Sequence, residues 1–311
     1  MKQQLTVTEL EAGTRVDRHL ADKLQIARAR LKDLFEEGRV RVDGRRVPKS
    51  AIVNAGARVE IDLPDEAASV LPEPDLPLAV LYEDDAILAL DKPAGMPVHP
   101  LATDERGTLA NALIARFPEC ARASADAPLE CGIAHRLDHE TSGVLLAART
   151  PDAYRALRAL FASREIDKRY TALVGGLIAD SGIVRLPIAH HPGDARRMVA
   201  CADEEKQRSL KAREATTSYA VQRWLGDFAL VDVDIPTGTR HQIRVHLAAI
   251  GAPIVGDALY GGETLDGLTR HFLHARRVGL RHPQNGRRLD IESPLPDDLA
   301  RVIARLSPPQ R

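Results

Sequence analysis

One carboxylate lies between a cationic and a potentially cationic side chain in the stretch CGIAHRLDHETSGVLLAAR, residues 131–149. Asp138 follows Arg136 by two positions and directly precedes His139, and the chain then turns apolar over residues 144–148, as a buried strand does. Rigid elements often present catalytic groups on a polar loop of this kind, where a carboxylate can act as nucleophile or base. A structural ion pair between Arg136 and Asp138 in a turn is the alternative.

Other chemistries for the same stretch find less support in the sequence. His135 and His139 stand four apart like two metal ligands, but no catalytic glutamate lies between them and no third ligand is evident. Asp138 and Glu140 could form the acid–base pair of a glycosidase, although nothing else places a second carboxylate. Ser142 lacks the GxSxG context of a serine hydrolase. No P-loop, dinucleotide fingerprint or zinc pattern is present.

Five segments, in the same order, resemble the motifs of the RluA-type family of RNA pseudouridine synthases. HRLDHETSG at 135–143 is similar to the central motif HRLDxxTSG of that family. The other four are LALDKPAGMPVHP at 88–100, KRYTALVGG at 168–176, HQIRVHLAAIGAPIVGDALYGG at 241–262 and LHARRVGLRHP at 273–283. Together the matches cover most of the chain beyond residue 80.

The resemblance implies conversion of uridine to pseudouridine in RNA. In this isomerisation the N1–C1′ glycosidic bond breaks, the uracil turns and C5 bonds to C1′. It requires no metal, nucleotide energy or organic cofactor, and we expect none here. Large-subunit ribosomal RNA is the favoured partner, with transfer RNA as the alternative. A non-catalytic RNA-binding protein or chaperone is a further alternative, against which Asp138, Tyr170 and Arg244 argue together.

Three catalytic roles follow from the resemblance. Asp138 would start the reaction, either by attacking C1′ or by removing the C2′ proton, and the sequence does not choose between these routes. Tyr170 would stack on the uracil or help to move its C5 proton, with a core strand tyrosine as the alternative. Arg244 would be the salt-bridge partner of Asp138, because a dry site disfavours an ionised carboxylate and a nearby cation opposes that effect. A surface ion pair is the alternative for Arg244.

Further residues of the motifs would hold the RNA around the target uridine. Arg136 would fill the gap left by the flipped base, because a planar cation that stacks and donates hydrogen bonds offsets part of the cost of flipping. His135, Thr141 and Ser142 are the other candidates for this group. Lys92 could approach a phosphate, or could equally be a turn lysine in water.

A helix expected over residues 240–250 would place Arg240 and Arg244 four apart on one face. We expect Arg244 to reach into the cleft and Arg240 to lie nearer the rim, where it would bind RNA. The family usually reads TGRxHQIR, whereas this chain has Thr-Gly-Thr-Arg at 237–240, so the first arginine is displaced by one position. The role of that arginine in the family is therefore not assigned to Arg240, whereas Arg244 is in register.

Residues 1–63 read as a small α/β unit that resembles an S4-type RNA-binding domain. Apolar residues at helical spacing over 16–24 and 27–37 precede a hairpin that turns at Asp43-Gly44. Five basic residues of this unit would face RNA phosphate, with a solvated helix face as the alternative. They are Arg28, Arg30, Lys32, Arg39 and Arg41.

Residues 64–78, PDEAASVLPEPDLPL, are rich in proline and acidic residues and read as a linker. Residues 79–311 would then form the catalytic domain. Its strand and helix patterns predict an α+β fold in which helices flank a mixed, largely antiparallel central sheet, with Asp138, Tyr170 and Arg244 lining the cleft. Strands are expected over 168–174, 217–224 and 228–236, and helices over 107–117 and from Pro151.

The composition is that of an ordinary soluble protein, with 44% apolar and 28% charged residues. No stretch is apolar enough for a membrane span, and the first residues lack an apolar signal core. The three cysteines form neither a disulfide framework nor a zinc pattern. We therefore expect a cytoplasmic monomer without a membrane or obligate protein partner. A net charge of −1 alone would not indicate a nucleic-acid binder.

Overall fold

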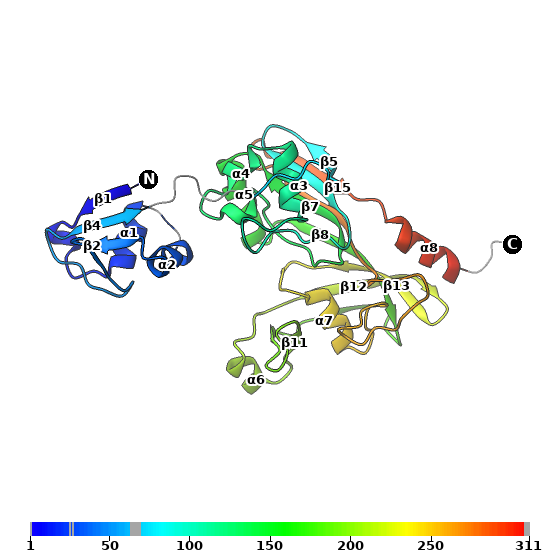
Figure 1. Ribbon diagram of the computed structural model, residues 1–311. Helices are drawn as coiled ribbons and strands as arrows, with labels where there is room; N and C mark the ends of the chain where they lie inside the picture. Colours follow the sequence, from blue (N-terminus) through cyan, green and yellow to red (C-terminus); the bar gives the residue numbers. More distant parts are fainter. Residues whose placement is uncertain (1, 25, 27, 63–69, 308–311) are drawn as a thin grey trace. The chain divides into compact units, whose positions relative to one another are not determined.

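The computed structural model describes residues 2–24, 26, 28–62 and 70–307, without the side chains at positions 2 and 28–30. The chain forms two compact units (Figure 1). The first comprises Met1–Ser69 with Asp126–Pro128, and the second comprises Val70–Ala125 with Leu129–Arg311. Of the predicted linker, residues 64–69 lie outside the described part of the chain. Residues 70–78 instead belong to the second unit, because Val70 is buried in its core.

The first unit is a four-stranded antiparallel sheet with two helices. Its strands are β1 (Lys2–Thr6), β2 (Val40–Val42), β3 (Arg45–Arg46) and β4 (Arg58–Asp62), in the order β1-β4-β2-β3, with η1 (Glu9–Glu11), α1 (Val16–Leu24) and α2 (Arg28–Glu36). Leu20, Leu31 and Val59 lie in the core between helices and sheet. Asp43 and Gly44 have φ angles of 49° and 77°, as the predicted two-residue hairpin turn requires.

A nine-stranded mixed sheet organises the second unit (Figure 1). Eight strands lie in the order β5-β6-β7-β14-β8-β13-β12-β9, and β15 pairs with β14. Every described pair is antiparallel except β14 with β7. The predicted fold class, α+β on a largely antiparallel sheet, is confirmed. The strands are β5 (Ala79–Glu83), β6 (Ile87–Lys92), β7 (Ser142–Ala148), β8 (Asp167–Gly175), β9 (Ser181–Val184), β12 (Thr217–Leu225), β13 (Phe228–Asp234), β14 (Leu273–Arg281) and β15 (Arg288–Glu292).

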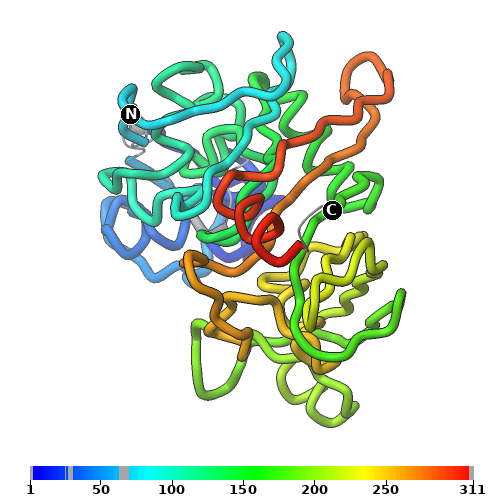
Figure 2. Tube along the Cα trace, turned by 90° about the vertical axis from the view of Figure 1, so that its right-hand side faces the viewer, coloured from blue at the N-terminus to red at the C-terminus, as the bar shows by residue number. Residues whose placement is uncertain are grey.

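Helices and a small hairpin complete the second unit. They are α3 (Leu109–Arg116), α4 (Cys120–Ala123), α5 (Pro151–Ala162), α6 (Glu204–Ser209), α7 (Gln242–Ala249), α8 (Asp297–Leu306) and the hairpin of β10 (Ile188–His190) with β11 (Met198–Ala200). The short η2 spans Pro128–Glu130. α4 and α5 pack on β7, and α7 packs on β12 and β11. α8, red in Figure 2, buries Leu299 and Val302 in the main core. Thr150 caps α5 and Pro151 begins it, as predicted.

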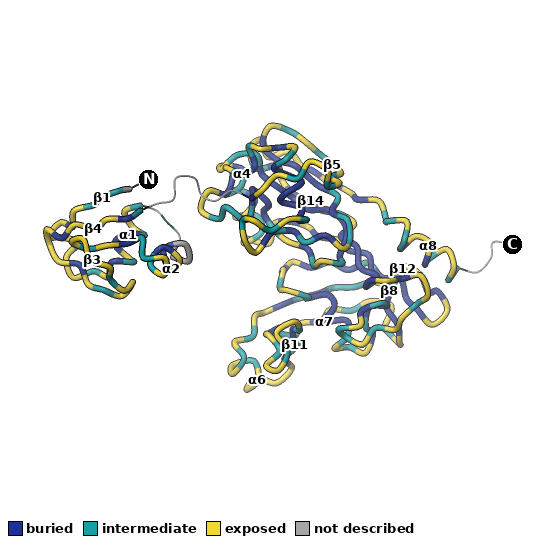
Figure 3. Tube along the Cα trace, in the orientation of Figure 1, coloured by how far each residue is buried: buried dark blue, intermediate teal, exposed yellow. Residues whose placement is uncertain are grey.

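The uninterrupted apolar run after Asp138 is explained by the position of β7 in the sheet. All seven residues of β7 are buried (Figure 3). Because side chains alternate along a strand, Leu145 and Ala147 enter one core cluster while Val144 and Leu146 enter the cluster on the other face. The loop that carries Asp138 is therefore attached to a strand that is packed on both faces.

The helix predicted over 240–250 begins later than expected. His241 has a left-handed backbone with φ 55°, and α7 starts at Gln242. The side chain of Gln242 accepts a hydrogen bond from the Thr239 backbone N–H at 3.1 Å, within the turn that precedes the helix. Arg240 therefore precedes the helix and does not share a helical face with Arg244, which corrects the prediction. Among the described helices, none is long and apolar enough to cross a membrane.

Candidate active site

A cavity of about 630 Å³ in the second unit brings together the three predicted catalytic residues, Asp138, Tyr170 and Arg244. They come from the loop before β7, from β8 and from α7. Asp138 is the one acidic residue of the described lining, which also carries six basic residues. These are Arg136, Arg158, Lys168, Arg213, Arg240 and Arg244. The cavity is therefore cationic, although the chain as a whole has a net charge of −1.

The loop of Asp138 is fixed through its backbone carbonyl groups. The Thr141 N–H donates to the carbonyl of Asp138 at 3.1 Å and closes a turn. The carbonyl of His139 accepts from Lys92 Nζ and from the Gly95 N–H, both at 3.0 Å. The carbonyl of Glu140 accepts from Arg270 at 3.1 Å. Three consecutive carbonyl groups are thus bound, so the loop holds the Asp138 side chain in one place.

A glycine directly after this loop allows two strands to meet closely. Gly143 of β7 has φ 118°, and a Cβ atom there would lie 2.2 Å from the carbonyl oxygen of Ala275 on β14. Ala275 pairs with Gly143 in the parallel β7–β14 contact. Any side chain at position 143 would push β14 away from the loop of Asp138.

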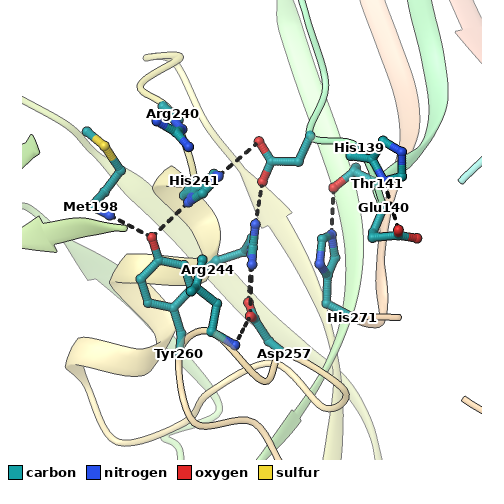
Figure 4. Close-up of polar contacts among 12 residues, drawn as sticks. His139, Glu140, Thr141, Met198, Arg240, His241, Arg244, Asp257, Tyr260 and His271 are labelled. Atoms are coloured by element: carbon teal, nitrogen blue, oxygen red, sulfur yellow. Dashed lines mark hydrogen bonds and ion pairs between the residues drawn. The ribbon is translucent and has the colours of Figure 1, made fainter. Parts of the chain in front are cut away.

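Arg244 is shared between two carboxylates (Figure 4). Its Nη1 donates to Asp138 Oδ2 at 3.0 Å, while Nε and Nη2 donate to the two oxygens of Asp257 at 2.6 and 2.9 Å. The side chains of Arg244 and Asp257 are 9% and 1% exposed, whereas that of Asp138 is 21% exposed. Asp257 therefore orients the guanidinium, and Asp138 remains accessible from the cavity.

The electrostatics of this group keep Arg244 charged. Burial alone would lower the pKa of Arg244, but the hydrogen bonds and charge of Asp257, with the charge of Asp138, raise it above the ordinary value. The result is a permanent, largely buried cation beside Asp138.

Tyr170 lies on β8 opposite Val233 of β13 and lines the cavity while only 8% exposed. Burial, with the nearby charge of Asp138, raises the pKa of Tyr170 above its usual range. The side chain is therefore a neutral phenol at physiological pH, with an aromatic ring that can contact a base.

Of the four predicted base-flipping residues, three line the cavity and one does not. Arg136 is exposed and lines the cavity, as the prediction requires. His135 also lines it, but its Nε2 accepts from the Leu146 N–H at 3.0 Å and burial lowers its pKa to about 3. Thr141 lines the cavity and its hydroxyl bonds to His271 at 2.8 Å. Ser142 is 1% exposed, bonds to His274 at 3.0 Å and is absent from the described lining, so the structure does not bring it into the site.

The prediction that Lys92 approaches a phosphate is wrong. Its side chain is completely buried, and Nζ donates to the carbonyl groups of Pro93, Met96 and His139 at 2.7, 2.8 and 3.0 Å. All three ammonium protons therefore have protein partners. Burial lowers the pKa of Lys92 to about 8. Lys92 holds the loop of Asp138 through the carbonyl of His139 and has no free N–H group for RNA.

The remaining basic candidates lie on the surface. Arg240 is exposed, lines the cavity and donates to the carbonyl groups of Ala195 and Arg196, both at 3.2 Å. In the first unit, Lys32 pairs with Glu36 at 3.6 Å, and Arg39 pairs with Glu37 and, at 3.9 Å, with Asp62. Arg41 is exposed and donates to the carbonyl of Gly44. The side chains of Arg28 and Arg30 lie outside the described part of the chain.

The residues of the site that were not predicted as functional include Arg158, Lys168, Arg213, His241, Asp257 and His271. Burial lowers the pKa of Lys168 to about 8, and its Nζ donates to the Thr237 carbonyl at 3.0 Å. His241 Nε2 lies 3.9 Å from Asp138 Oδ1. Asp257 and His241 both fall inside the quoted segment 241–262, which was the signal that could have found them. No pattern in the sequence singles out His271 as a partner of Thr141.

Comparison with known proteins identifies relatives of this chain. The family model described as RNA pseudouridylate synthase matches residues 86–249. Ribosomal large subunit pseudouridine synthase D of Xanthomonas campestris pv. campestris is 35% identical over 317 residues, which cover 97% of this chain and 92% of that protein. An uncharacterized RNA pseudouridine synthase of Chloroflexus aurantiacus is 40% identical, with coverage of 97% and 93%.

A solved structure, human RNA pseudouridylate synthase domain containing 4, superposes with a TM-score of 0.56 and 26% identity. The superposition covers 73% of this chain and 92% of the human chain. The matched segment 86–249 contains Asp138, Tyr170 and Arg244. The chain therefore belongs to the RNA pseudouridylate synthase family.

Proposed function

We propose that this enzyme converts uridine to pseudouridine in large-subunit ribosomal RNA, with Asp138 as the nucleophile or base. One observation carries the catalytic assignment: Asp138 is the single carboxylate in the described lining of a cavity that otherwise carries six basic side chains. The name of the Xanthomonas campestris relative, which refers to the ribosomal large subunit, favours ribosomal RNA as the substrate. Transfer RNA is the second candidate substrate.

The reaction would begin at Oδ1 of Asp138, the oxygen that Arg244 does not bind. Asp138 lines the cavity, and Oδ1 can either attack C1′ or remove the C2′ proton of the target nucleotide. In either route the N1–C1′ bond breaks, the uracil turns within the cavity and C5 bonds to C1′. The C5 proton then leaves, N1 gains a proton, and Asp138 returns to its starting state. The buried cation Arg244 stabilises the carboxylate throughout without a change in its own charge.

Tyr170 and the cavity wall would hold the base during its rotation. The neutral phenol of Tyr170 offers an aromatic face to the uracil and a hydroxyl that can take part in proton transfer at C5. A cavity of about 630 Å³ is large enough for a nucleoside. Exclusion of bulk water would protect the cleaved intermediate from hydrolysis.

The basic residues of the lining would bind the RNA around the flipped nucleotide. Arg136 precedes Asp138 by two positions, is exposed and lines the cavity. It can take the place of the flipped base in the RNA stack. Arg213 and Arg240, both exposed, can contact neighbouring phosphates. The first unit, proposed as an S4-type RNA-binding domain, would add affinity through its exposed Lys32 and Arg41.

The proposal is tested with transcripts of large-subunit ribosomal RNA and with transfer RNA as separate substrates. Release of tritium from C5-labelled uridine measures turnover, and chemical mapping locates the pseudouridine. Wild type is expected to modify the ribosomal transcript, and Asp138→Asn is expected to bind it without product. Modification of transfer RNA alone would reject the ribosomal target. Release of free uracil, or no isomerisation of either RNA, would reject the activity.

A further inference from the structure

His241 occupies an unusual backbone position at the edge of the catalytic cavity. It has φ 55° in the left-handed region, directly before α7, and its side chain is only 10% exposed. Residues other than glycine rarely adopt this conformation, and they persist there when surrounding contacts fix them. The ring lines the cavity with Nε2 3.9 Å from Asp138 Oδ1, the oxygen that Arg244 does not bind.

The hydroxyl of Tyr260 contacts both the backbone N–H of Met198 and the ring of His241 (Figure 4). The Met198 N–H donates to this hydroxyl at 2.8 Å, and an amide N–H cannot accept in return. The same hydroxyl lies 2.8 Å from His241 Nδ1. Burial raises the pKa of Tyr260, so the phenol keeps its proton. Among the described residues His241 Nδ1 is the one acceptor bonded to this hydroxyl, so the arrangement that satisfies both groups has the Tyr260 O–H donating to Nδ1.

The proton on the imidazole must then be on Nε2. Burial lowers the pKa of His241 to about 4, so the ring is neutral at physiological pH and carries one N–H group. With Nδ1 accepting from Tyr260, that N–H is Nε2–H, and it faces Asp138 Oδ1. A contact of 3.9 Å is longer than a hydrogen bond, but catalytic contacts often shorten when the substrate binds.

We propose that His241, oriented by Tyr260, is a positioning residue that donates a second hydrogen bond to the catalytic carboxylate, on Oδ1. The proposal rests on the proposed role of Asp138. With Arg244 on Oδ2 and His241 on Oδ1, the plane of the carboxylate is fixed, and the remaining lone pair of Oδ1 faces the sugar. By either route, the same donor stabilises the carboxylate when it returns to its starting state at the end of the reaction.

A purely structural His241 would behave differently in a matched pair of variants. In His241→Gln the amide NH₂ lies near the position of Nε2 and keeps a donor for Oδ1. In His241→Asn the amide lies near Nδ1, so it keeps a partner for Tyr260 but loses the donor for Oδ1. We expect kcat to fall by about tenfold or more in His241→Asn, with KM within about threefold, and to recover most of the loss in His241→Gln. Equal losses in the two variants would overturn the proposal.

A second measurement on the intact protein does not depend on turnover. Nitrogen chemical shifts of ¹⁵N-labelled histidine, with His241→Gln used to assign the signal, report the tautomer directly. We expect Nε2–H at neutral pH, and a mixture of tautomers in Tyr260→Phe. A proton on Nδ1 in wild type would overturn the proposal even if the variants lose activity. If wild type formed no pseudouridine, the proposed function would fail, while the tautomer would still decide the hydrogen-bond arrangement.

Discussion

Arg244 binds Asp138 through a single nitrogen atom, Nη1, which donates to Oδ2 at 3.0 Å. The other side of its guanidinium is bound to both oxygens of Asp257. If the fork of Arg244 faced Asp138 with two donors, both carboxylate oxygens would be occupied. Because both oxygens of Asp257 bind the other two nitrogen atoms of the guanidinium, Arg244 leaves Oδ1 of Asp138 unbound and still provides a cation beside it.

Substitution of Asp138 should abolish chemistry and leave binding intact. Asp138→Asn keeps the shape of the side chain and can still contact Arg244, but an amide is neither a nucleophile nor a base here. We expect correct folding, RNA affinity close to wild type and no pseudouridine. Filter binding and tritium release on one transcript measure both quantities. Activity within tenfold of wild type would remove Asp138 from its proposed role.

Arg244 and Arg240 should separate catalysis from RNA binding. Arg244→Met removes the buried cation that binds Asp138 Oδ2, so the catalytic carboxylate loses its partner and turnover should largely disappear. Arg240→Met removes an exposed cation at the cavity and should mainly weaken RNA binding. The rate of pseudouridine formation and the RNA affinity of both variants, measured on one RNA, check this. Collapse of catalysis in Arg240→Met with near-normal Arg244→Met would reverse the two roles.

Asp257 should matter for both stability and turnover. Asp257→Asn removes the buried charge that orients Arg244, although Asp138 remains as a partner. We expect the free energy of unfolding to fall by about 3 kcal/mol, the lower end for a broken buried ion pair. Turnover should also drop, because the guanidinium of Arg244 can then rotate and bind both oxygens of Asp138. Urea denaturation and kcat are the measurements, and Asp234→Asn, which breaks the exposed pair with Arg169, is the control.

Lys92 should give the stability of the protein a distinct pH dependence. Burial lowers its pKa from 10.5 to about 8, so between these values the unfolded chain holds a proton that the folded chain has released. The free energy of unfolding of wild type should therefore rise relative to Lys92→Met as the pH increases from 8 toward 10.5. Denaturation of both proteins at pH 7.5 and 10 tests the sign. A constant difference would mean that its three carbonyl partners keep the ammonium charged throughout.

The sequence predicted those features of the fold and site that depend on residues within one short segment. The motif around Asp138 and the register of HQIR predicted that Asp138 and Arg244 lie together, and the structure joins them by a hydrogen bond. The alternation of residues predicted the hairpin at Asp43-Gly44. The start of α7 could not be predicted, because it depends on the left-handed backbone of His241 and on the contact between Thr239 and the Gln242 side chain. The burial of Lys92 was equally hidden, because one of its carbonyl partners, that of His139, lies 47 positions away.

The cationic character of the site was also invisible in the sequence. A net charge of −1 averages over the whole chain, whereas the fold gathers six basic side chains from distant segments around Asp138. Two acidic residues outside the described cavity lining, Asp257 and Asp298, form ion pairs with the buried Arg244 and Arg270. Only the topology of the sheet decides which charges face the cavity.

The first unit should contribute affinity and leave the chemistry unchanged. Its exposed Lys32 and Arg41 can contact phosphate, while the cavity residues all belong to the second unit. A fragment that starts at Val70, the first buried residue of the second unit, should stay folded and keep turnover at high RNA concentration. Each phosphate contact that is lost should reduce the slope of log K against log salt by about 0.7–0.9, so its salt dependence should be flatter. Titrations of the fragment and the full chain at several salt concentrations test this. Equal affinity and equal slope for the two proteins would show that the second unit binds RNA alone.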